Sequence, residues 1–364
     1  MKISEITSCL EKFAPLKYQE SYDNAGLIVG NKNAEIEKAL ICVDVTEKII
    51  DEAIETKSKL VIAHHPLIFD GIKKITGENY VERIIIKAIK NDIAIYAAHT
   101  NFDNSFYGVN SILSKKIGLT NTKILNAKSD VLRKLVTFCP LNKAEEVRNA
   151  LFEAGAGHIG NYDSCSFNVS GEGSFKALND AKPYVGEINK LHFEKEVRIE
   201  TIYSVYNEPK IINSLLKTHP YEEVAYDIYP LKNNFNKVGA GMIGELEREE
   251  NEKDFLLRIK KIVKIECIKH SEFLGKKIKK VAVCGGSGSF LISDAIASGA
   301  DIFITSDVKY HQFFDADNKI IIADIGHYES EQFIKELLLS ILKKNFPNFA
   351  ARISEVNTNS VNYL

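Results

Sequence analysis

The chain has 364 residues, more than one ordinary hydrophobic core requires, so we expect two domains or one domain with an insertion. A hydrophobic content of 45% and a charged content of 26% are typical of globular proteins, and the formal net charge of −2 excludes a global attraction to nucleic acid or anionic membranes. No stretch approaches the roughly 18 apolar residues of a membrane helix, and the first residues lack the apolar segment of a secretion signal. We therefore expect a cytoplasmic protein.

The first 125 residues alternate between strand and helix patterns, which predicts an α/β sheet. Thr46 is a natural N-cap for the second helix. The predicted helices cover residues 3–13, 46–56, 80–91 and 108–118, and the predicted strands cover 38–45, 59–65 and 93–99.

The pattern changes near residue 130 to the β-α-β-β-α-β order of a ferredoxin-like module. The doubly wound pattern resumes later, with a helix at 254–263 and strands at 279–283 and 301–306. We therefore predict one discontinuous α/β domain, residues 1–129 and 236–364, interrupted by a ferredoxin-like domain at 130–235. The two segments of the first domain are expected to supply two halves of one sheet.

Six candidate metal ligands occur in three short clusters, each after a predicted apolar strand: His64 and His65, His99 and Asp103, and His327 and Glu331. His327 and Glu331 are four residues apart and would share one face of a helix. A lone histidine at a strand end is usually a surface or hydrogen-bonded residue. Three such clusters together favour a metal site.

The adjacent histidines His64 and His65 indicate more than one ion. Pro66 favours an extended conformation at His65, so the two imidazoles should point to opposite sides of the chain. Metal ions in two-metal hydrolytic sites lie roughly 3.5–4 Å apart, which is close to the spacing of consecutive Cα atoms. Each histidine would then bind its own ion, with carboxylates shared between the ions.

Two further segments have open interpretations. The segment 284–290 (CGGSGSF) follows a strand, so its N–H groups either bind an anion or simply form a tight turn. Asp307, Lys309 and His311 follow the strand 301–306 and suit an acid, a base or a phosphate ligand, although His311 could equally cap a helix. The segment 239–244 (GAGMIG) fits G-x-G-x-x-G, but it follows a polar linker and does not predict a dinucleotide site.

The six cysteines are predicted to be reduced and mostly buried, because they form no C-x-x-C pair. We expect none of them next to the ligand clusters. They are Cys9, Cys42, Cys139, Cys165, Cys267 and Cys284.

These motifs resemble the Nif-three-like family, also called dinuclear-metal-centre hexameric proteins or GTP cyclohydrolase I type 2 homologues. The matching segments are 22–30 (YDNAGLIVG), 63–69 (AHHPLIF), 98–103 (AHTNFD), 283–289 (VCGGSGS), 305–311 (TSDVKYH) and 326–331 (GHYESE). The middle of the chain is similar to the insert of longer bacterial members, through 155–167, 171–175 (GEGSF) and 219–231 (HPYEEVAYDIYPL).

The resemblance implies five metal ligands, a catalytic or substrate-facing role for His99, and a homohexamer built as a trimer of dimers. The ligands it implies are His64, His65, Asp103, His327 and Glu331. The insert would be similar to CutA or PII proteins. One departure is Lys176-Ala177, where many members have a proline, and it concerns only the insert.

Two functions remain open. The first is a hydrolase in which two divalent ions activate water against a nucleotide-like or phosphorylated substrate, with His99 and His311 as catalytic candidates. The second is a non-catalytic regulatory or metal-handling hexamer whose insert binds a ligand or a partner. Imidazole and carboxylate ligands suit zinc first, with iron, manganese or cobalt as alternatives. Neither function requires a membrane or a nucleic acid.

Overall fold

The computed structural model describes residues 1–364, which divide into two compact units. The first unit combines residues 1–127 with 236–364, and the second comprises residues 128–235. The chain leaves the first unit through strand β5 (Leu119–Lys128) and returns through strand β10 (Phe235–Asn251). None of the helices combines the length and apolar character needed to span a membrane.

The first unit contains a five-stranded sheet with the order β1-β4-β3-β2-β15. All neighbouring strands are parallel except β1, which pairs antiparallel with β4. The central strands are buried along their whole length, as expected for a parallel sheet covered on both faces. The strands are β1 (Gly26–Val29), β2 (Lys38–Cys42), β3 (Leu60–Ala63), β4 (Ala94–Ala97) and β15 (Ala350–Ile353).

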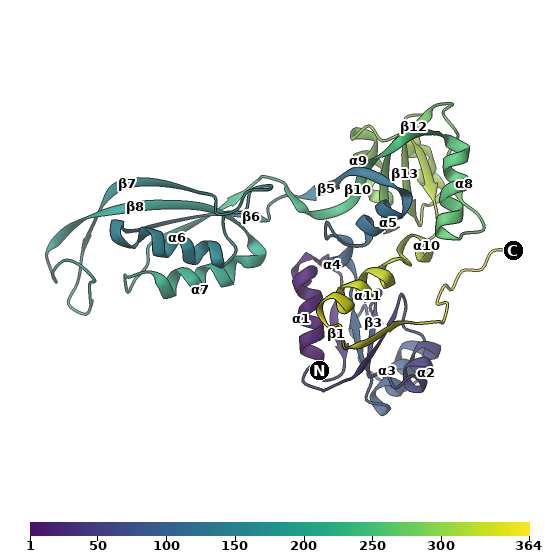
Figure 1. Cartoon of the computed structure of the whole chain (residues 1–364), viewed down its shortest axis with the longest axis horizontal. Helices are drawn as coiled ribbons and strands as arrows, with labels where there is room; N and C mark the ends of the chain where they lie inside the picture. The colour runs from purple at the N-terminus through teal and green to yellow at the C-terminus, as the bar shows by residue number, and fades with distance from the viewer. The chain divides into compact units, whose positions relative to one another are not determined.

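Two pairs of helices cover this sheet. Helices α1 (Ile3–Phe13) and α11 (Ile334–Asn345) pack on one face, whereas α2 (Glu47–Glu55) and α3 (Tyr80–Lys90) pack on the other (Figure 1). Thr46 caps α2 as predicted, because its hydroxyl oxygen accepts a hydrogen bond from the Ile49 N–H at 3.3 Å.

A second, six-stranded sheet in the same unit has the order β11-β14-β13-β12-β10-β5. Its central strands β12, β13 and β14 are parallel. Helices α5 and α8 supply side chains to the core on one face, and α9 to the core on the other. The new elements are α5 (Val109–Ile117), α8 (Glu252–Val263), α9 (Ile292–Ala297), β11 (Lys269–His270), β12 (Lys277–Ser287), β13 (Ile302–Ser306) and β14 (Ile321–Asp324).

The expectation of a single sheet for the first unit is therefore wrong. Strand β3 precedes His64 in the five-stranded sheet, and strand β14 precedes His327 in the six-stranded sheet. Alternating strands and helices indicate parallel pairing within each segment, but they do not specify pairing between distant segments. The last strand, β15, returns to β2 in the first sheet and leaves β12–β14 as a separate parallel core.

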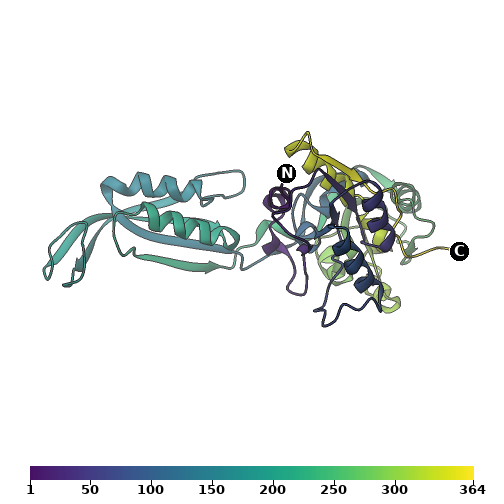
Figure 2. The same ribbon diagram turned by 90° about the horizontal axis from the view of Figure 1, so that it is seen from below.

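The second unit has the β-α-β-β-α-β order that its sequence predicts. Its antiparallel sheet has the strand order β7-β8-β6-β9. Both helices lie side by side on one face of this sheet, as both ribbon views show (Figures 1 and 2). The elements are β6 (Leu132–Pro140), α6 (Ala144–Glu153), β7 (Ser166–Lys176), β8 (Leu191–Ser204), α7 (Glu208–Thr218) and β9 (Tyr226–Leu231).

Candidate metal centre

Three strand ends deliver the predicted ligands to one place in the first unit. His64 and His65 follow β3, and Asp103 ends the short helix α4 (Thr100–Asp103) beyond β4. Gly326 adopts a φ of 82° after β14, and helix α10 (His327–Glu331) begins at the next residue. This turn sets His327 and Glu331 on one short helix, as their spacing predicts. The five side chains thus come from both sheets.

His64, Asp103 and Glu331 form the first group of ligand atoms. The Nε2 atom of His64 lies 3.6 Å from Asp103 Oδ1 and 3.6 Å from Glu331 Oε1. His64 is fully buried, and neither its Nε2 nor Asp103 Oδ1 has a hydrogen-bond partner. Buried polar atoms are normally satisfied, so two orphaned atoms facing each other fit a position where a cation would bind.

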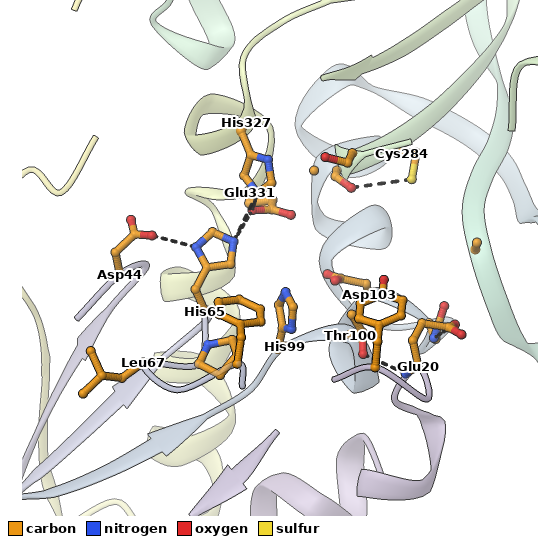
Figure 3. A pocket seen from close by; sticks show the side chains of 18 of the residues that line it. Glu20, Asp44, His65, Leu67, His99, Thr100, Asp103, Cys284, His327 and Glu331 are labelled. Carbon is orange, nitrogen blue, oxygen red and sulfur yellow. Dashed lines mark hydrogen bonds and ion pairs between the residues drawn. The ribbon is translucent and has the colours of Figure 1, made fainter. Parts of the chain in front are cut away.

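The second group uses the other oxygen of Glu331. His65 Nε2 lies 3.0 Å from Glu331 Oε2, and His327 Nε2 lies 3.1 Å from the same oxygen. The two imidazole nitrogens are 3.2 Å apart (Figure 3). Glu331 therefore stands between the groups, with one carboxylate oxygen toward each. The adjacent histidines contact different oxygens of Glu331, but their rings do not point to opposite sides of the chain as expected. Their ring centroids are 4.9 Å apart, and the ligand atoms of His64, His65 and Glu331 all lie within 4.8 Å of one another.

Each histidine of the site has its Nδ1 atom engaged, which turns its Nε2 atom away from that partner. Each of the four Nδ1–oxygen distances is 2.7 Å. Such contacts fix the tautomer and the orientation of metal-binding imidazoles. The pairs are His64 with the Ala98 carbonyl, His65 with Asp44, His99 with Asp23, and His327 with Asp307.

The electrostatics of the group are those of closely packed acids and imidazoles, of which His64 and Glu331 are fully or almost fully buried. Burial raises the pKa of Asp103 to about 7, and the charge of Glu331 adds to that rise. Burial also opposes ionisation of Glu331, but the neighbouring histidines hold its pKa well below its ordinary value. Burial disfavours the charged form of His65, yet hydrogen bonds to Asp44 and Glu331 raise its pKa to about 10. Binding of a cation by these side chains would displace the protons that they hold.

A cavity of about 880 Å³ opens over these ligands. Its rim carries four exposed aromatic side chains, and no lysine or arginine lines it. The negative charge of a bound substrate therefore has no lysine or arginine of this cavity to meet it. The aromatic residues are Tyr22, Phe69, Tyr80 and Phe290.

His99 and His311, the two predicted catalytic histidines, occupy different places. His99 lines the cavity, with its ring centroid 5.4 Å from that of His64 and 5.5 Å from that of His65. His311 lies exposed on the 3-10 helix Tyr310–Ala316, against Tyr310 and Phe314, and does not line the cavity. The structure brings His99 to the ligands but does not bring His311 there.

Cys284 corrects the expectation that no cysteine adjoins the site. Its buried side chain lines the cavity, because strand β12 ends beside α10. Burial, together with the charges of Asp103 and Glu331, raises the pKa of this thiol far above its ordinary value. Cys284 is therefore held as a neutral thiol. All six cysteines are free as expected, but only three are buried, not most of them: Cys9 and Cys165 are partly buried and Cys267 is exposed.

The glycine-rich segment 284–290 does not offer an anion-binding loop. Its three glycine N–H groups are already used: those of Gly285, Gly286 and Gly288 donate to Asn110 Oδ1, Ser330 Oγ and Thr305 Oγ1 at 2.8–3.0 Å. Gly286 instead makes room for Glu331, since a Cβ there would overlap a carboxylate oxygen. The segment 239–244 lies inside strand β10, which is not the turn of a dinucleotide site.

Two acids at the site carried no predicted role. Asp44 follows β2 at the sheet edge where His64 and His65 follow β3, so its position after an apolar strand is a usable signal. Asp23 precedes β1 and accepts hydrogen bonds from the Thr100 N–H and hydroxyl as well as contacting His99. Asp307 was recognised as a candidate acid or base, but it contacts His327 and Ser287.

Comparisons with known proteins agree along the whole chain. Residues 1–360 match the model of the family described as Duf34/NIF3 (NGG1p interacting factor 3). A Bacillus subtilis relative named GTP cyclohydrolase 1 type 2 homolog is 40% identical over 99% of this chain and 98% of its own length. A Halalkalibacterium halodurans relative of the same name is 38% identical, with complete coverage of both chains.

Two crystal structures are also similar to this chain along its whole length. The crystal structure of a Bacillus cereus protein related to NIF3 has a TM-score of 0.86 and 38% sequence identity, covering 100% of this chain and 99% of its own. A Staphylococcus aureus crystal structure has a TM-score of 0.80 and 30% identity, with the same coverage.

Proposed function

The chain belongs to the Duf34/NIF3 family, and from this premise we propose that it is a hydrolase with a dinuclear metal centre. The proposed substrate is nucleotide-like or phosphorylated. His64, Asp103 and Glu331 would hold one divalent ion. His65, His327 and the second oxygen of Glu331 would hold the other.

The observation that carries this proposal is the buried, orphaned pair formed by His64 Nε2 and Asp103 Oδ1. Hydrogen bonding alone leaves these atoms unsatisfied, whereas a cation between them would satisfy both. Imidazole and carboxylate ligands suit zinc, with iron, manganese and cobalt as alternatives.

The metal ions and the side chains would have different roles in the proposed reaction. Divalent ions held by these residues would supply an activated water and stabilise negative charge developing on the substrate. His99 would exchange a proton with the substrate. Asp23 holds its Nδ1, so its Nε2 is the nitrogen left to contact a molecule bound in the cavity. Asp23 itself stays ionised: burial opposes this, but the hydrogen bonds from His99 and Thr100 lower its pKa.

Two features of the cavity bear on which substrates it would bind: its four exposed aromatic side chains, and the absence of lysine and arginine from its lining. Tyr22, Phe69, Tyr80 and Phe290 offer flat apolar surfaces on which a purine or another planar ring could stack. A triphosphate would bring several negative charges to a cavity lined by Glu20, Asp44 and other acids. We therefore favour a planar substrate with few phosphates over a nucleoside triphosphate.

The test combines metal content with turnover. Protein purified without a histidine tag is analysed for metals and then screened against nucleosides, nucleotides and phosphoesters. We expect bound divalent ions and a hydrolysed substrate, with activity abolished in His64→Ala and retained in His270→Ala, which alters an exposed histidine on β11. Protein that neither contains nor responds to divalent ions would overturn the proposal.

His99→Ala separates the proton-transfer role from metal binding. We expect kcat to fall by about 10²–10⁴-fold while the metal content stays unchanged, because His99 contacts no metal-ligand atom in the two groups. A parallel His311→Ala variant tests the other predicted histidine. A fall in kcat for His311→Ala alone would restore the role that the sequence suggests for it.

Two further proposals concern the oligomeric state of the protein and the fold of its second unit. We propose a homohexamer, on the strength of the family resemblance, which light scattering would measure as six times the chain's 40.8 kDa. We also infer that the second unit is a ferredoxin-like module, supported by its element order and its strand order β7-β8-β6-β9.

A second candidate function is ligand binding by the second unit, with or without catalysis in the first. The observation that favours it is a separate cavity of about 740 Å³ within residues 138–225. A binding protein of this kind would retain its ligand without turning over a substrate.

A further inference from the structure

The cavity of the second unit lies on the sheet face opposite its helices. Val197 and Ile199 of β8 point into the helix-covered core, so the alternate residues Glu196 and Arg198 point to the other face. Phe138, Arg198 and Val169 form one row across β6, β8 and β7 on that face. All three line the cavity, and its remaining lining residues come from 170–176 of β7, from Glu196 and from the segments 177–184 and 221–225.

Three aromatic rings surround part of this space. The ring centroids of Phe175 and Tyr184 each lie 6.2 Å from that of Tyr221, with interplanar angles of 55° and 50°. The rings are thus tilted around a common space and do not stack on one another. All three line the cavity and none is fully buried, so each is partly exposed to the cavity.

The buried His219 holds Tyr221 in place. Its Nδ1 accepts a hydrogen bond from the Tyr221 N–H at 3.1 Å, and its Nε2 donates to the Phe138 carbonyl at 2.9 Å. Burial lowers the pKa of His219, which agrees with the neutral tautomer that these two bonds require. The His-Pro-Tyr sequence at 219–221 therefore fixes an aromatic wall of the cavity.

One glycine of β7, Gly173, clears space for a carboxylate. Gly171 pairs with Glu196, and a Cβ at Gly173 would overlap the Glu196 carboxylate. Nothing lies within 4 Å of a Cβ at Gly171, so that position opens into free space. The Tyr221 hydroxyl donates to Glu196 Oε1 at 2.8 Å and fixes the carboxylate beside the rings.

The charge of the lining is negative overall. Its four carboxylates outnumber its two basic side chains, and Arg198 is already paired with Glu200 at 2.9 Å. Phosphates would meet repulsion here, whereas a positive group would be attracted by both the acids and the ring faces. The acids are Glu172, Glu196, Glu222 and Glu223, and the basic residues are Lys176 and Arg198.

We propose that this cavity binds an organic cation with an N-alkylated ammonium head, held among Phe175, Tyr184 and Tyr221 and paired with Glu196. Cations are attracted to the faces of aromatic rings, and rings tilted about one space can contact an alkylated ammonium from several sides. This proposal deepens the second candidate function, and it does not depend on the metal centre or on hydrolysis.

The test is calorimetric titration of the full-length protein with choline and, separately, with its uncharged carbon isostere dimethylbutanol. We expect choline to bind and the isostere to bind at least about tenfold more weakly, because only the cation gains the electrostatic attraction. Tyr221→Ala and Glu196→Gln should each weaken choline binding by about tenfold. Tyr229→Ala, an exposed tyrosine of β9 outside the cavity, should leave it unchanged.

Several outcomes would overturn the inference: no choline binding at millimolar concentration, equal binding of the isostere, or preferential binding of ATP. Tyr221→Phe guards against misfolding, because it keeps the ring and loses only the hydroxyl bond to Glu196. This variant should bind choline more tightly than Tyr221→Ala does. His64→Ala should still bind choline, so failure of the metal proposal and failure of this one are distinguishable.

Discussion

Individual side chains around the candidate ligands decide how the imidazoles point. Asp44 contacts His65 Nδ1 at 2.7 Å and also accepts a hydrogen bond from the Thr358 hydroxyl at 2.9 Å. The residues next to the C-terminus thereby help to hold an acid that orients a ligand. Partners of this kind fix ring orientation and raise the basicity of the metal-binding nitrogen.

Asp44→Ala tests this arrangement at the residue scale. We expect metal affinity to fall by roughly 10–100-fold, because His65 loses the partner that orients its Nε2 toward Glu331. Competition with a chromogenic chelator measures the affinity, and Asp51→Ala, which removes an exposed acid of α2, is the control. Equal affinities in the two variants would contradict the role given to Asp44.

The sequence predicted the candidate metal ligands, but it did not predict the acidic side chains that orient them. His64, His65, Asp103, His327 and Glu331 each follow an apolar strand or share a helical face, and these are local patterns. Asp44 and Asp23 contact histidines 21 and 76 residues away, so no local pattern pairs them. His311 has the same local context as the ligands, but its 3-10 helix exposes it.

At the scale of elements, the start of helix α3 depends on one ionised carboxylate. Glu82 accepts hydrogen bonds from the N–H groups of Thr76, Gly77 and Glu78, and from the Thr76 hydroxyl. These hydrogen bonds, chiefly those from Thr76, lower its pKa from the ordinary 4.5 to about 2. The carboxylate therefore ties the preceding loop to the first turn of the helix.

The pH dependence of stability follows from that lowered pKa. A group whose pKa falls on folding stabilises the protein above its unfolded value and loses that effect as the pH falls toward its folded value. We expect wild type to be more stable than Glu82→Gln above about pH 5, and this difference to shrink between about pH 4.5 and 2. Urea unfolding of both proteins at several pH values measures it, and a difference independent of pH would contradict the assignment.

Several strands were missed because their sequences lack an apolar run. Strand β10 contains the glycines of 239–244 and ends in charged residues, so its sequence does not predict a strand. Strand β15 is four residues long and only half-buried at alternate positions. These strands form through pairing with distant partners, such as β15 with β2. Helices α1, α2 and α3 were predictable because each has a strong amphipathic pattern.

At the scale of the whole molecule, the order of strand and helix patterns along the sequence predicts an α/β fold and an interrupted first unit. It does not predict that this unit contains two separate sheets. The five ligands lie where these two sheets meet, so the site depends on long-range packing of residues 1–127 with 236–364. The second unit enters between two neighbouring strands, β5 and β10. These two strands run antiparallel, because the end of β5 lies beside the beginning of β10. A Cβ at Gly239 would touch Asn126 and Ala127, whereas one at Gly244 would touch Thr120 and Leu119.

This geometry predicts that the second unit can be removed without loss of the metal centre. Two adjacent antiparallel strands can be joined by a short turn, so a chain with residues 129–234 replaced by Asn-Gly and a few flanking residues should keep the six-stranded sheet. We expect this variant to bind metal with the affinity of the full chain, because every candidate ligand and its Nδ1 partner lies outside the deleted segment. Choline binding should disappear. Metal analysis and calorimetry of the shortened chain measure both results, and a folded variant that had lost its metal would show that the centre depends on the second unit.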